Sequence, residues 1–351
     1  MSHTVIECQQ VWKIFGEQTN KAMKAVQDEG LGKAEVLERF QSVVAVADAS
    51  FQVSEGEIFC IMGLSGSGKS TLLRLINRLI EPTSGHILIN GKDISILNSV
   101  DLRTLRSEKI GMVFQNVGLL PHRTVRDNVA FPLELRQVPM PERYEVAEKM
   151  LERVCLSGWD DRMPSELSGG MQQRVGLARA LAADPDILLM DEPFSALDPL
   201  IRRQLQNQFL ELSSAIQKTT VFITHDLDEA IRLGNRIAIM KDGVLMQIGT
   251  PEEIVTRPVD DYVAEFVKGI SRLTLVRAHT VMQPIDTYHG TTGDDLACLP
   301  TASSEADLNE LINLSVETDT PILILKDNKP VGIVTKRNLL RGIQGEKDYG
   351  E

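Results

Sequence analysis

The sequence has no long hydrophobic run. No stretch of about 18 or more uncharged apolar residues occurs among its 351 residues, so we expect no helix that spans a bilayer. The N-terminus, Met1 to Glu7, lacks the basic start and apolar stretch of a secretory signal, and none is expected.

Cysteine and positive charge are also scarce. Cys8, Cys60, Cys155 and Cys298 are widely separated and form no Cys-x-x-Cys pair, which predicts reduced, mostly buried thiols in a cytosolic protein. The 37 Lys and Arg residues against 49 Asp and Glu give a net charge of −12. Because nucleic-acid binding needs a basic surface, we expect no nucleic-acid partner, although a local basic groove stays compatible with this composition.

The chain is long enough for two domains, and its hydrophobic content of 42% is that of a globular core. We predict an α/β domain over residues 1–270 and a small second domain over residues 271–351. The apolar runs 58–62, 187–190 and 220–224 are typical of strands that are buried on both faces.

Further elements follow from periodicity. In the first domain, residues 43–46 and 50–53 are predicted as two strands, while 71–79, 142–151 and 172–181 are predicted as helices.

Residues 19–40 are charged and are predicted to form a solvated, helical surface segment. In the second domain we predict a strand over 276–282, a helix over 305–314, a hairpin from 321–325 to 331–334, and a helix over 335–343.

A glycine-rich loop follows the strand 58–62. Its glycines permit a tight turn that points N–H groups at phosphate oxygens, and the next helix adds its N-terminal dipole. We expect Lys69 to reach the β- and γ-phosphates and the Ser70 hydroxyl to ligate Mg²⁺. A chance glycine-rich turn does not account for the order strand, loop, helix. The predicted ATP-binding residues of this P-loop, or Walker A motif, are Gly63, Leu64, Ser65, Gly66, Ser67, Gly68, Lys69, Ser70 and Thr71.

Two carboxylates follow the buried run 187–190. We expect Asp191 to hold Mg²⁺ through water and Glu192 to act as the general base that polarises the attacking water. The alternative is that the two carboxylates simply mark the exposed end of a strand, and the neighbouring motifs disfavour this interpretation.

The stretch Leu167-Ser168-Gly169-Gly170-Met171 lies between these two motifs. It precedes the helix 172–181, so it forms an anion-binding helix N-terminus that has no phosphate of its own chain to hold. A two-fold dimer resolves this, because the turn then clamps the γ-phosphate held by the other P-loop. The predicted residues of this trans signature turn are Ser168, Gly169, Gly170 and Met171.

With these motifs in this order, the chain resembles the ATP-binding subunit of an ABC transporter. The stretches 121–125, 198–202 and 227–230 make it most similar to subunits for uptake of quaternary amines such as glycine betaine, proline betaine or choline. The resemblance implies an α/β P-loop NTPase of the ABC type. Such a fold has a RecA-like core, a β-rich N-terminal subdomain and a helical signature subdomain.

The resemblance also implies roles for residues that no sequence pattern of their own would indicate. His225 is implied to be the switch histidine that contacts the γ-phosphate. Gln115 is implied to sense Mg²⁺ and water, and to begin the loop that touches the membrane partner. The resemblance therefore implies a catalytic set of Glu192, His225 and Gln115, and metal ligands Ser70, Gln115 and Asp191.

Other implied roles concern the dimer and the base. Asp198 belongs to the D-loop, which crosses to the opposite subunit. Met171 replaces the more common glutamine of the signature turn and changes no role assigned here. Phe15 aligns with the aromatic residue that stacks on adenine, with a core phenylalanine as the alternative and Trp12 as a second candidate.

The second domain resembles a single CBS domain, from its β-α-β-β-α order and the stretch 332–335. Such domains usually occur as pairs, so the resemblance implies that this unit docks against the same unit of a partner subunit. Asn338 lies where the family often has a ribose-binding residue. The implied role is to tune transport in response to ionic strength or a nucleotide.

The resemblance implies an energy-coupling ATPase, peripheral at the cytoplasmic face of the inner membrane, with ATP and Mg²⁺ as cofactors. The implied partners are a second copy of the chain, a transmembrane permease and, indirectly, a substrate-binding protein. An importer ATPase for another small solute is one alternative.

Other classes fit less well. A soluble ABC ATPase of DNA repair or ribosomes usually has two ATPase units or a large insertion, and a CBS-type sensor needs a paired module. A P-loop kinase or GTPase has no use for the signature turn or for His225.

Overall fold

The chain divides into two compact units. A computed structural model describes residues 3–115, 117–195, 197–285, 299–318 and 320–344. By internal contacts, unit 1 is Met1–Ile248 and unit 2 is Gly249–Glu351. The domain boundary predicted after residue 270 falls inside unit 2 and stays a prediction, while Cys298 lies outside the described residues.

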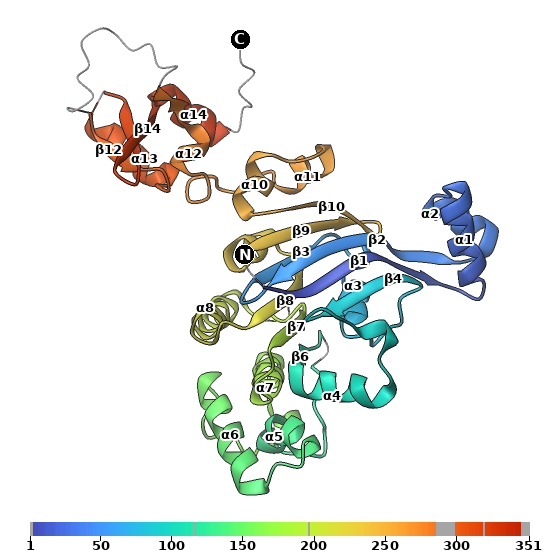
Figure 1. Ribbon diagram of the computed structural model, residues 1–351. Helices are drawn as coiled ribbons and strands as arrows, with labels where there is room; N and C mark the ends of the chain where they lie inside the picture. The colour runs from blue at the N-terminus through green and yellow to red at the C-terminus, as the bar shows by residue number, and fades with distance from the viewer. Residues whose placement is uncertain (1–2, 116, 196, 286–298, 319, 345–351) are drawn as a thin grey trace. The chain divides into compact units, whose positions relative to one another are not determined.

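A six-stranded sheet forms the centre of unit 1 (Figure 1). Its strands run β10-β9-β3-β8-β7-β6, and the five strands from β9 to β6 are parallel to one another. In this order the strands are Val244–Gly249, Arg236–Lys241, Ile58–Met62, Thr219–Thr224, Ile187–Asp191 and Ile110–Val113. Every residue of β3, β7 and β8 is buried, which confirms the predicted buried strands and places their carboxyl ends at one edge.

A second, antiparallel sheet has the order β2-β1-β4-β5. These strands are Val43–Ser54, Thr4–Phe15, Ser84–Ile89 and Lys92–Asp93. Residues 43–46 and 50–53 are strand residues as predicted, but they belong to a single strand, because β2 continues through both. Asp48, which lies between the two predicted segments, has a positive φ of 48°, and the pairing with β1 shifts register near it. The strand therefore continues through this polar residue with a local irregularity.

The helix α3 (Lys69–Ile76) packs its apolar side against both sheets. Leu72, Leu73, Leu75 and Ile76 are completely buried in the core cluster that contains residues of both sheets. This burial anchors the helix, so the loop that precedes it has a rigid support.

The remaining helices of unit 1 follow the strands. They are α4 (Ser99–Lys109), α5 (Val125–Leu135), α6 (Met140–Arg153), α7 (Gly169–Ala182), α8 (Pro199–Ile216) and α9 (Leu227–Leu233), with short 3₁₀ turns at Ile94–Ile96 and Pro164–Glu166. The helices α5, α6 and α7 pack against one another (Figure 1). The helices predicted at 71–79, 142–151 and 172–181 are confirmed as α3, α6 and α7 with shifted ends.

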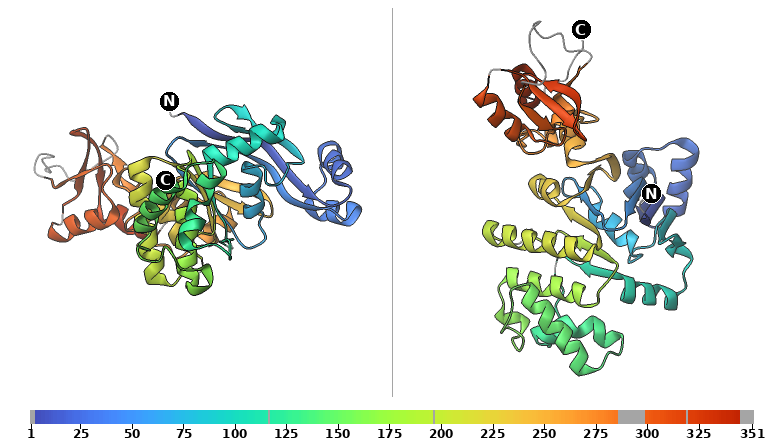
Figure 2. Two further views of the ribbon diagram at one scale, coloured as in Figure 1. Left: turned by 90° about the horizontal axis from the view of Figure 1, so that it is seen from below. Right: turned by 60° about the vertical axis from the view of Figure 1, so that its left-hand side comes forward.

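The segment 19–40 is helical as predicted, but it is not simply a solvated helix. It forms two helices, α1 (Thr19–Glu29) and α2 (Lys33–Phe40), and Gly30 ends the first with a φ of 69°. Ala22, Met23 and Val36 are buried in a small cluster with residues of β1 and β2. Figures 1 and 2 show the pair beside one end of these long strands.

Unit 2 contains a four-stranded sheet of order β11-β14-β13-β12. Its elements are α10 (Pro251–Thr256), α11 (Asp261–Phe266), α12 (Ala278–Val281), β11 (Gln283–Pro284), β12 (Thr301–Ser303), α13 (Leu308–Glu317), β13 (Ile322–Lys326), β14 (Lys329–Val334) and α14 (Lys336–Gln344). The hairpin β13–β14 is confirmed, and Asp327 and Asn328 both have a positive φ, as a two-residue hairpin turn requires.

The strand predicted at 276–282 is wrong. Residues 278–281 form the helix α12, and the residues that pair with β14 are Gln283 and Pro284, which lie beyond the predicted strand. Val276 and Ala278 are buried in the unit's core, and the Ala278 N–H donates to the Ala306 carbonyl. A segment of seven residues that mixes apolar and polar side chains is compatible with either structure, and tertiary packing decides between them.

None of the described helices, in either unit, is long and apolar enough to cross a membrane.

Candidate active site

The P-loop connects β3 to α3 in a conformation that only glycine adopts easily. Gly63, Gly66 and Gly68 have φ values of 155°, 79° and 103°. A Cβ at Gly63 would lie 2.1 Å from the Met240 carbonyl oxygen, and one at Gly68 would lie 2.2 Å from the Ala45 carbonyl oxygen. The glycines are therefore required both by the backbone angles and by the close approach of neighbouring strands.

Lys69 turns its ammonium group back toward this loop. Its Nζ donates to the carbonyl oxygens of Gly63 at 2.8 Å and Leu64 at 2.9 Å. Burial lowers the pKa of Lys69, while the nearby carboxylates of Glu192 and Asp191 oppose that change. The loop thus holds a desolvated cation, which is suited to phosphate oxygens.

Asp191 ends β7 and is completely buried. Its Oδ1 accepts a hydrogen bond from the Ser70 hydroxyl at 2.8 Å. Its Oδ2 has no hydrogen-bond partner among the described residues, and the guanidinium of Arg74 lies 3.6 Å away. A buried carboxylate oxygen without a partner is costly, and oxygen donors of this kind suit Mg²⁺.

The described residues contain no cluster of three or more His, Cys, Asp or Glu that could hold a metal alone. A hydroxyl and one carboxylate fit a magnesium ion that takes its other ligands from phosphate and water.

Three side chains from three strand ends meet at Glu192. The Gln115 amide, which follows β6, donates to Glu192 Oε2 at 3.3 Å, and His225 Nδ1, which follows β8, lies 3.3 Å from the same oxygen. Glu192 has a φ of 47°, an uncommon backbone angle for a residue other than glycine, and its N–H donates to the Ile223 carbonyl. The parallel sheet therefore brings together residues predicted from distant parts of the chain.

The signature turn caps α7. The Ser168 hydroxyl accepts a hydrogen bond from the Met171 N–H at 3.3 Å, so this side chain is an N-cap. Ser168 and Gly169 are exposed, and a Cβ at Gly169 would meet no atom within 4 Å. A Cβ at Gly170 would lie 2.8 Å from the side chain of Leu197. The turn thus presents an open helix N-terminus beside the D-loop.

Asp198 has a role within its own chain. Its Oδ1 accepts hydrogen bonds from the N–H groups of Leu200 and Ile201, which caps α8. Ala196 of the D-loop lies outside the described residues.

Phe15, the last residue of β1, is 41% exposed, so it is not a core phenylalanine. The Lys13 ammonium lies 4.9 Å from its ring centroid. Trp12 packs in the small cluster under α1 and α2, which leaves Phe15 the more accessible ring.

Asn338 of unit 2 has a local structural role. It is buried, and its Oδ1 accepts hydrogen bonds from the Thr335 N–H and hydroxyl, while its own N–H donates to that hydroxyl. This capping arrangement accounts for the burial of Asn338 without a ligand.

Two arginines at the site had not been predicted. Arg74 lies four residues after Ser70 on α3, a spacing that places both side chains on one helix face and could have indicated it. Arg202 contacts Asp226 and the carbonyl of Leu197. No local sequence pattern indicates these contacts of Arg202.

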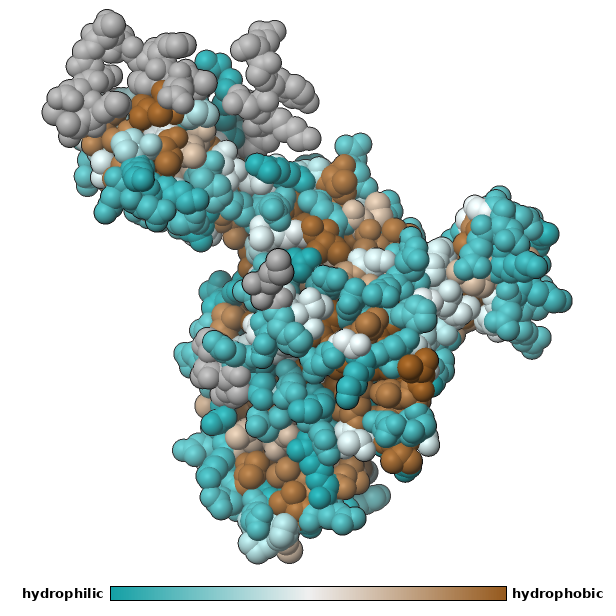
Figure 3. All heavy atoms as spheres, in the orientation of Figure 1, coloured by the Kyte–Doolittle hydropathy of each residue, from teal (hydrophilic) through white to brown (hydrophobic). Residues whose placement is uncertain are grey.

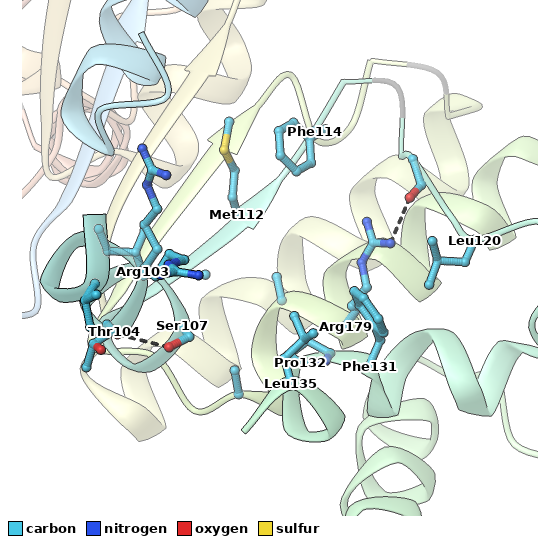
Figure 4. A pocket seen from close by; sticks show the side chains of 17 residues that line it. Arg103, Thr104, Ser107, Met112, Phe114, Leu120, Phe131, Pro132, Leu135 and Arg179 are labelled. Carbon is cyan, nitrogen blue, oxygen red and sulfur yellow. Dashed lines mark hydrogen bonds between the residues drawn. The ribbon is translucent and has the colours of Figure 1, made fainter. Parts of the chain in front are cut away.

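A groove of about 810 Å³ lies in unit 1 between the α4–β6 segment and the helices α5 and α7 (Figure 4). Apolar side chains such as Phe114 and Phe131 line it together with Arg103, Arg106 and Arg179. The Arg179 guanidinium donates to the carbonyl oxygens of residues 117 and 118. Figure 3 shows hydrophobic side chains gathered on this face of unit 1.

Comparison with known proteins agrees with this geometry. The ABC transporter family model matches residues 46–195. The glycine betaine transport ATP-binding protein OpuAA of Bacillus subtilis is 51% identical over 292 residues, which cover 83% of this chain and 70% of that protein. The trimethylamine N-oxide transport system ATP-binding protein TmoW of Pelagibacter ubique is 43% identical over 343 residues, 98% of each chain.

A solved dimeric structure of the ATP-binding cassette MJ0796, bound to ADP and Pi, is also similar. It has a TM-score of 0.61 at 32% identity and covers 70% of this chain and 98% of that one.

The fold and site therefore define an ABC-type P-loop ATPase with an additional C-terminal α/β region. The chain belongs to the ABC transporter ATP-binding proteins of the quaternary-amine uptake family.

Proposed function

We propose that this chain is the energy-coupling ATPase of an importer for quaternary-amine compatible solutes such as glycine betaine, proline betaine or choline. The observation that carries the ATPase role is the meeting of Gln115, Glu192 and His225 beside the P-loop. The solute class rests on relatives such as OpuAA, and TmoW makes another small solute the second candidate.

In the proposed mechanism the P-loop amides and Lys69 bind the phosphates of ATP, and Phe15 stacks on adenine. Glu192 accepts the proton of the attacking water. Gln115 and His225 hold the Glu192 carboxylate, and His225 also contacts the γ-phosphate. Ser70, Asp191 through water, and Gln115 would hold Mg²⁺, which when bound neutralises negative charge on the phosphates.

A second copy of the chain completes each site. The turn from Ser168 to Met171 presents N–H groups at an exposed helix N-terminus, and a γ-phosphate bound by the partner's P-loop supplies the anion it lacks. The D-loop that ends at Asp198 lies beside this turn and faces the same partner. ATP binding then closes the dimer, and hydrolysis opens it.

The permease would dock in the groove beside Phe114. In the described part of the chain this groove is lined by apolar and basic residues together with Thr104 and Ser107, and its lining includes no Asp or Glu. A short cytoplasmic helix of the permease with apolar and acidic side chains fits that chemistry. Phe114 precedes Gln115, so the docked helix would act directly on the residue that holds Glu192.

This docking places the chain at the cytoplasmic face of the membrane as a peripheral subunit, with a substrate-binding protein as an indirect partner and no nucleic acid. Residues 271–351 would form a CBS-like domain that pairs with the same domain of the second copy. Its proposed role is to tune transport in response to ionic strength or a nucleotide.

The test is uptake of radiolabelled solutes by cells that express this chain with the permease and binding-protein genes encoded beside it. We expect ATP-dependent uptake of at least one quaternary amine, and loss of uptake with Glu192→Gln. Uptake of an unrelated solute alone would overturn the solute assignment. ATP hydrolysis by the chain, with no uptake of any solute tested in cells that also contain the permease, would favour a soluble ABC ATPase.

A further inference from the structure

Arg202 joins two functional loops of unit 1. It lies in the first turn of α8, and its guanidinium donates to the Leu197 carbonyl at 3.2 Å and to Asp226 Oδ2 at 3.3 Å. Leu197 belongs to the D-loop, and Asp226 directly follows His225. One planar group therefore spans segments that are 29 residues apart along the chain (226 − 197).

In the proposed dimer, the Leu197 end of this bridge faces the partner. The Leu197 side chain is buried, and a Cβ at Gly170 would lie 2.8 Å from its Cδ2 atom. Close packing of this kind means that a shift of the signature turn displaces Leu197 as well. In the proposed dimer, this turn contacts the nucleotide held by the second copy.

The Asp226 end is tied to the chain's own site. Asp226 Oδ1 accepts a hydrogen bond from the Glu229 N–H and caps α9, and the Asp226 N–H donates to the Thr224 hydroxyl. His225 lies between these two clamped residues, and its Nδ1 is 3.3 Å from Glu192 Oε2. A displacement of Asp226 therefore reorients His225 relative to the general base.

We propose that Arg202 is a positioning residue that couples the two ATP sites of the dimer. When the signature turn and D-loop close on the partner's nucleotide, Arg202 transmits the movement of Leu197 to Asp226 and sets His225 in the chain's own site. A guanidinium is suited to this because it presents several fixed donors at once, whereas the lysine ammonium is a single point of charge. The inference rests on the proposed ATP-sandwich dimer.

The test compares Arg202→Met and Arg202→Lys with Arg203→Met, which changes the exposed neighbouring arginine in the same helix turn. ATP affinity is measured with a fluorescent ATP analogue, and kcat and the Hill coefficient are measured by phosphate release.

We expect Arg202→Met to lower kcat by about tenfold and the Hill coefficient from about two toward one, with ATP affinity unchanged. Arg202→Lys should restore little of the cooperativity. Arg203→Met should resemble the wild type.

A double-mutant cycle separates coupling from a general structural effect. Asp226→Asn keeps an amide oxygen for the cap of α9 and removes the charged acceptor. We expect Arg202→Met and Asp226→Asn to reduce the Hill coefficient similarly, and the double variant to be no worse than either single variant.

Additive losses, or equal kinetics for the variants at positions 202 and 203, would overturn the role of Arg202. If Arg202→Met does not fold, Arg202→Lys and Asp226→Asn decide by the same criteria. A wild-type chain that hydrolyses ATP without cooperativity would overturn the coupling, whereas a wild-type chain that hydrolyses no ATP would contradict the proposed function.

Discussion

At the scale of single residues, the carboxylate of Glu192, the proposed general base, is held in one orientation. Both Gln115 and His225 approach one carboxylate oxygen, and the positive φ of Glu192 turns its side chain out of the strand direction. The second oxygen is then available to a water molecule. Replacing the carboxylate by an amide keeps this shape and removes the proton acceptor.

Glu192→Gln should therefore lower ATP hydrolysis by at least about 100-fold and leave ATP binding unchanged. Because the bound ATP is not consumed, the variant should accumulate as a dimer with two sandwiched nucleotides. Phosphate release measures the first effect, and size-exclusion chromatography with ATP measures the second.

Lys69→Ala is the matched control for Glu192→Gln. It removes the cation that is proposed to bind phosphate, so it should weaken ATP binding itself. Hydrolysis by Glu192→Gln near the wild-type rate would remove Glu192 from the role of base. Unchanged ATP affinity in Lys69→Ala would contradict the P-loop assignment.

At the scale of elements, the N-terminus of α7 is exposed and suited to binding a phosphate. We expect this phosphate to belong to the nucleotide bound by the partner chain and not to the one bound by the same chain. Ser168→Arg places a bulky cation at this exposed N-terminus, which opposes the helix dipole and blocks closure. Monomeric ATP binding should be spared while dimer hydrolysis is lost. In a mixed dimer, hydrolysis at the partner's P-loop should be impaired.

The mixed dimer decides between cis and trans sites. It pairs a Ser168→Arg chain with a chain that carries Lys69→Ala, so that only one P-loop can bind ATP. The P-loop that binds ATP is that of the Ser168→Arg chain, and it faces the unchanged turn of the partner, so hydrolysis should be retained there. Loss of hydrolysis at this P-loop would contradict the two-chain site.

The helix α9 carries a buried acid that gives a prediction for pH. Burial raises the pKa of Glu229 above its ordinary value near 4.5, despite side-chain hydrogen bonds from Thr224 and Gln206 that lower it. The folded state therefore favours the protonated form. This contribution to stability is fully present below the unfolded pKa and is lost as pH rises through the folded pKa.

Glu229→Gln, which is neutral at every pH, should accordingly become more stable relative to the wild type as pH rises from about 5 to about 8. Urea unfolding at both pH values measures the difference. Asp228→Asn, an exposed acid of the same helix, is the control and should show little change. A wild-type advantage that grows with pH would show that Glu229 is stabilised as a carboxylate.

At the scale of the whole molecule, the division after Ile248 assigns α10 and α11 to unit 2 by their contacts. Within that unit, Glu252 on α10 accepts hydrogen bonds from the Arg277 N–H and the Thr280 hydroxyl. A truncation after residue 271 therefore exposes surfaces that a truncation after Ile248 removes. The two truncations test which boundary is functional.

Deletion of residues 272–351 should leave ATP hydrolysis by the dimer largely intact and alter the response of uptake to salt or to a nucleotide. A truncation after Ile248 should have the same effect on hydrolysis and uptake if α10 and α11 function as part of unit 2. Loss of basal hydrolysis in a folded truncation would show that the deleted part belongs to the motor. An unaltered response to salt and to every nucleotide tested would leave it a structural role only.

The ATPase core could be predicted from the sequence, because its signals are local. A buried strand, a glycine-rich loop and a helix are contiguous, and so is the signature turn with the helix that it caps. The sequence signal of the hairpin 321–334 is also contained in one short stretch. Its turn residues, which accept a positive φ, lie between two apolar strands.

Features that depend on contacts between distant residues could not be predicted from the sequence and became apparent in the three-dimensional structure. Whether residues 276–282 form a strand or a helix depended on packing against Ala306 and the core of unit 2. The exposure of Phe15, the single strand β2 and the burial beneath α1 were likewise decided by neighbouring elements. Arg202 touches Asp226 because α8 and α9 follow adjacent parallel strands, and side-chain spacing along the chain does not specify such a contact.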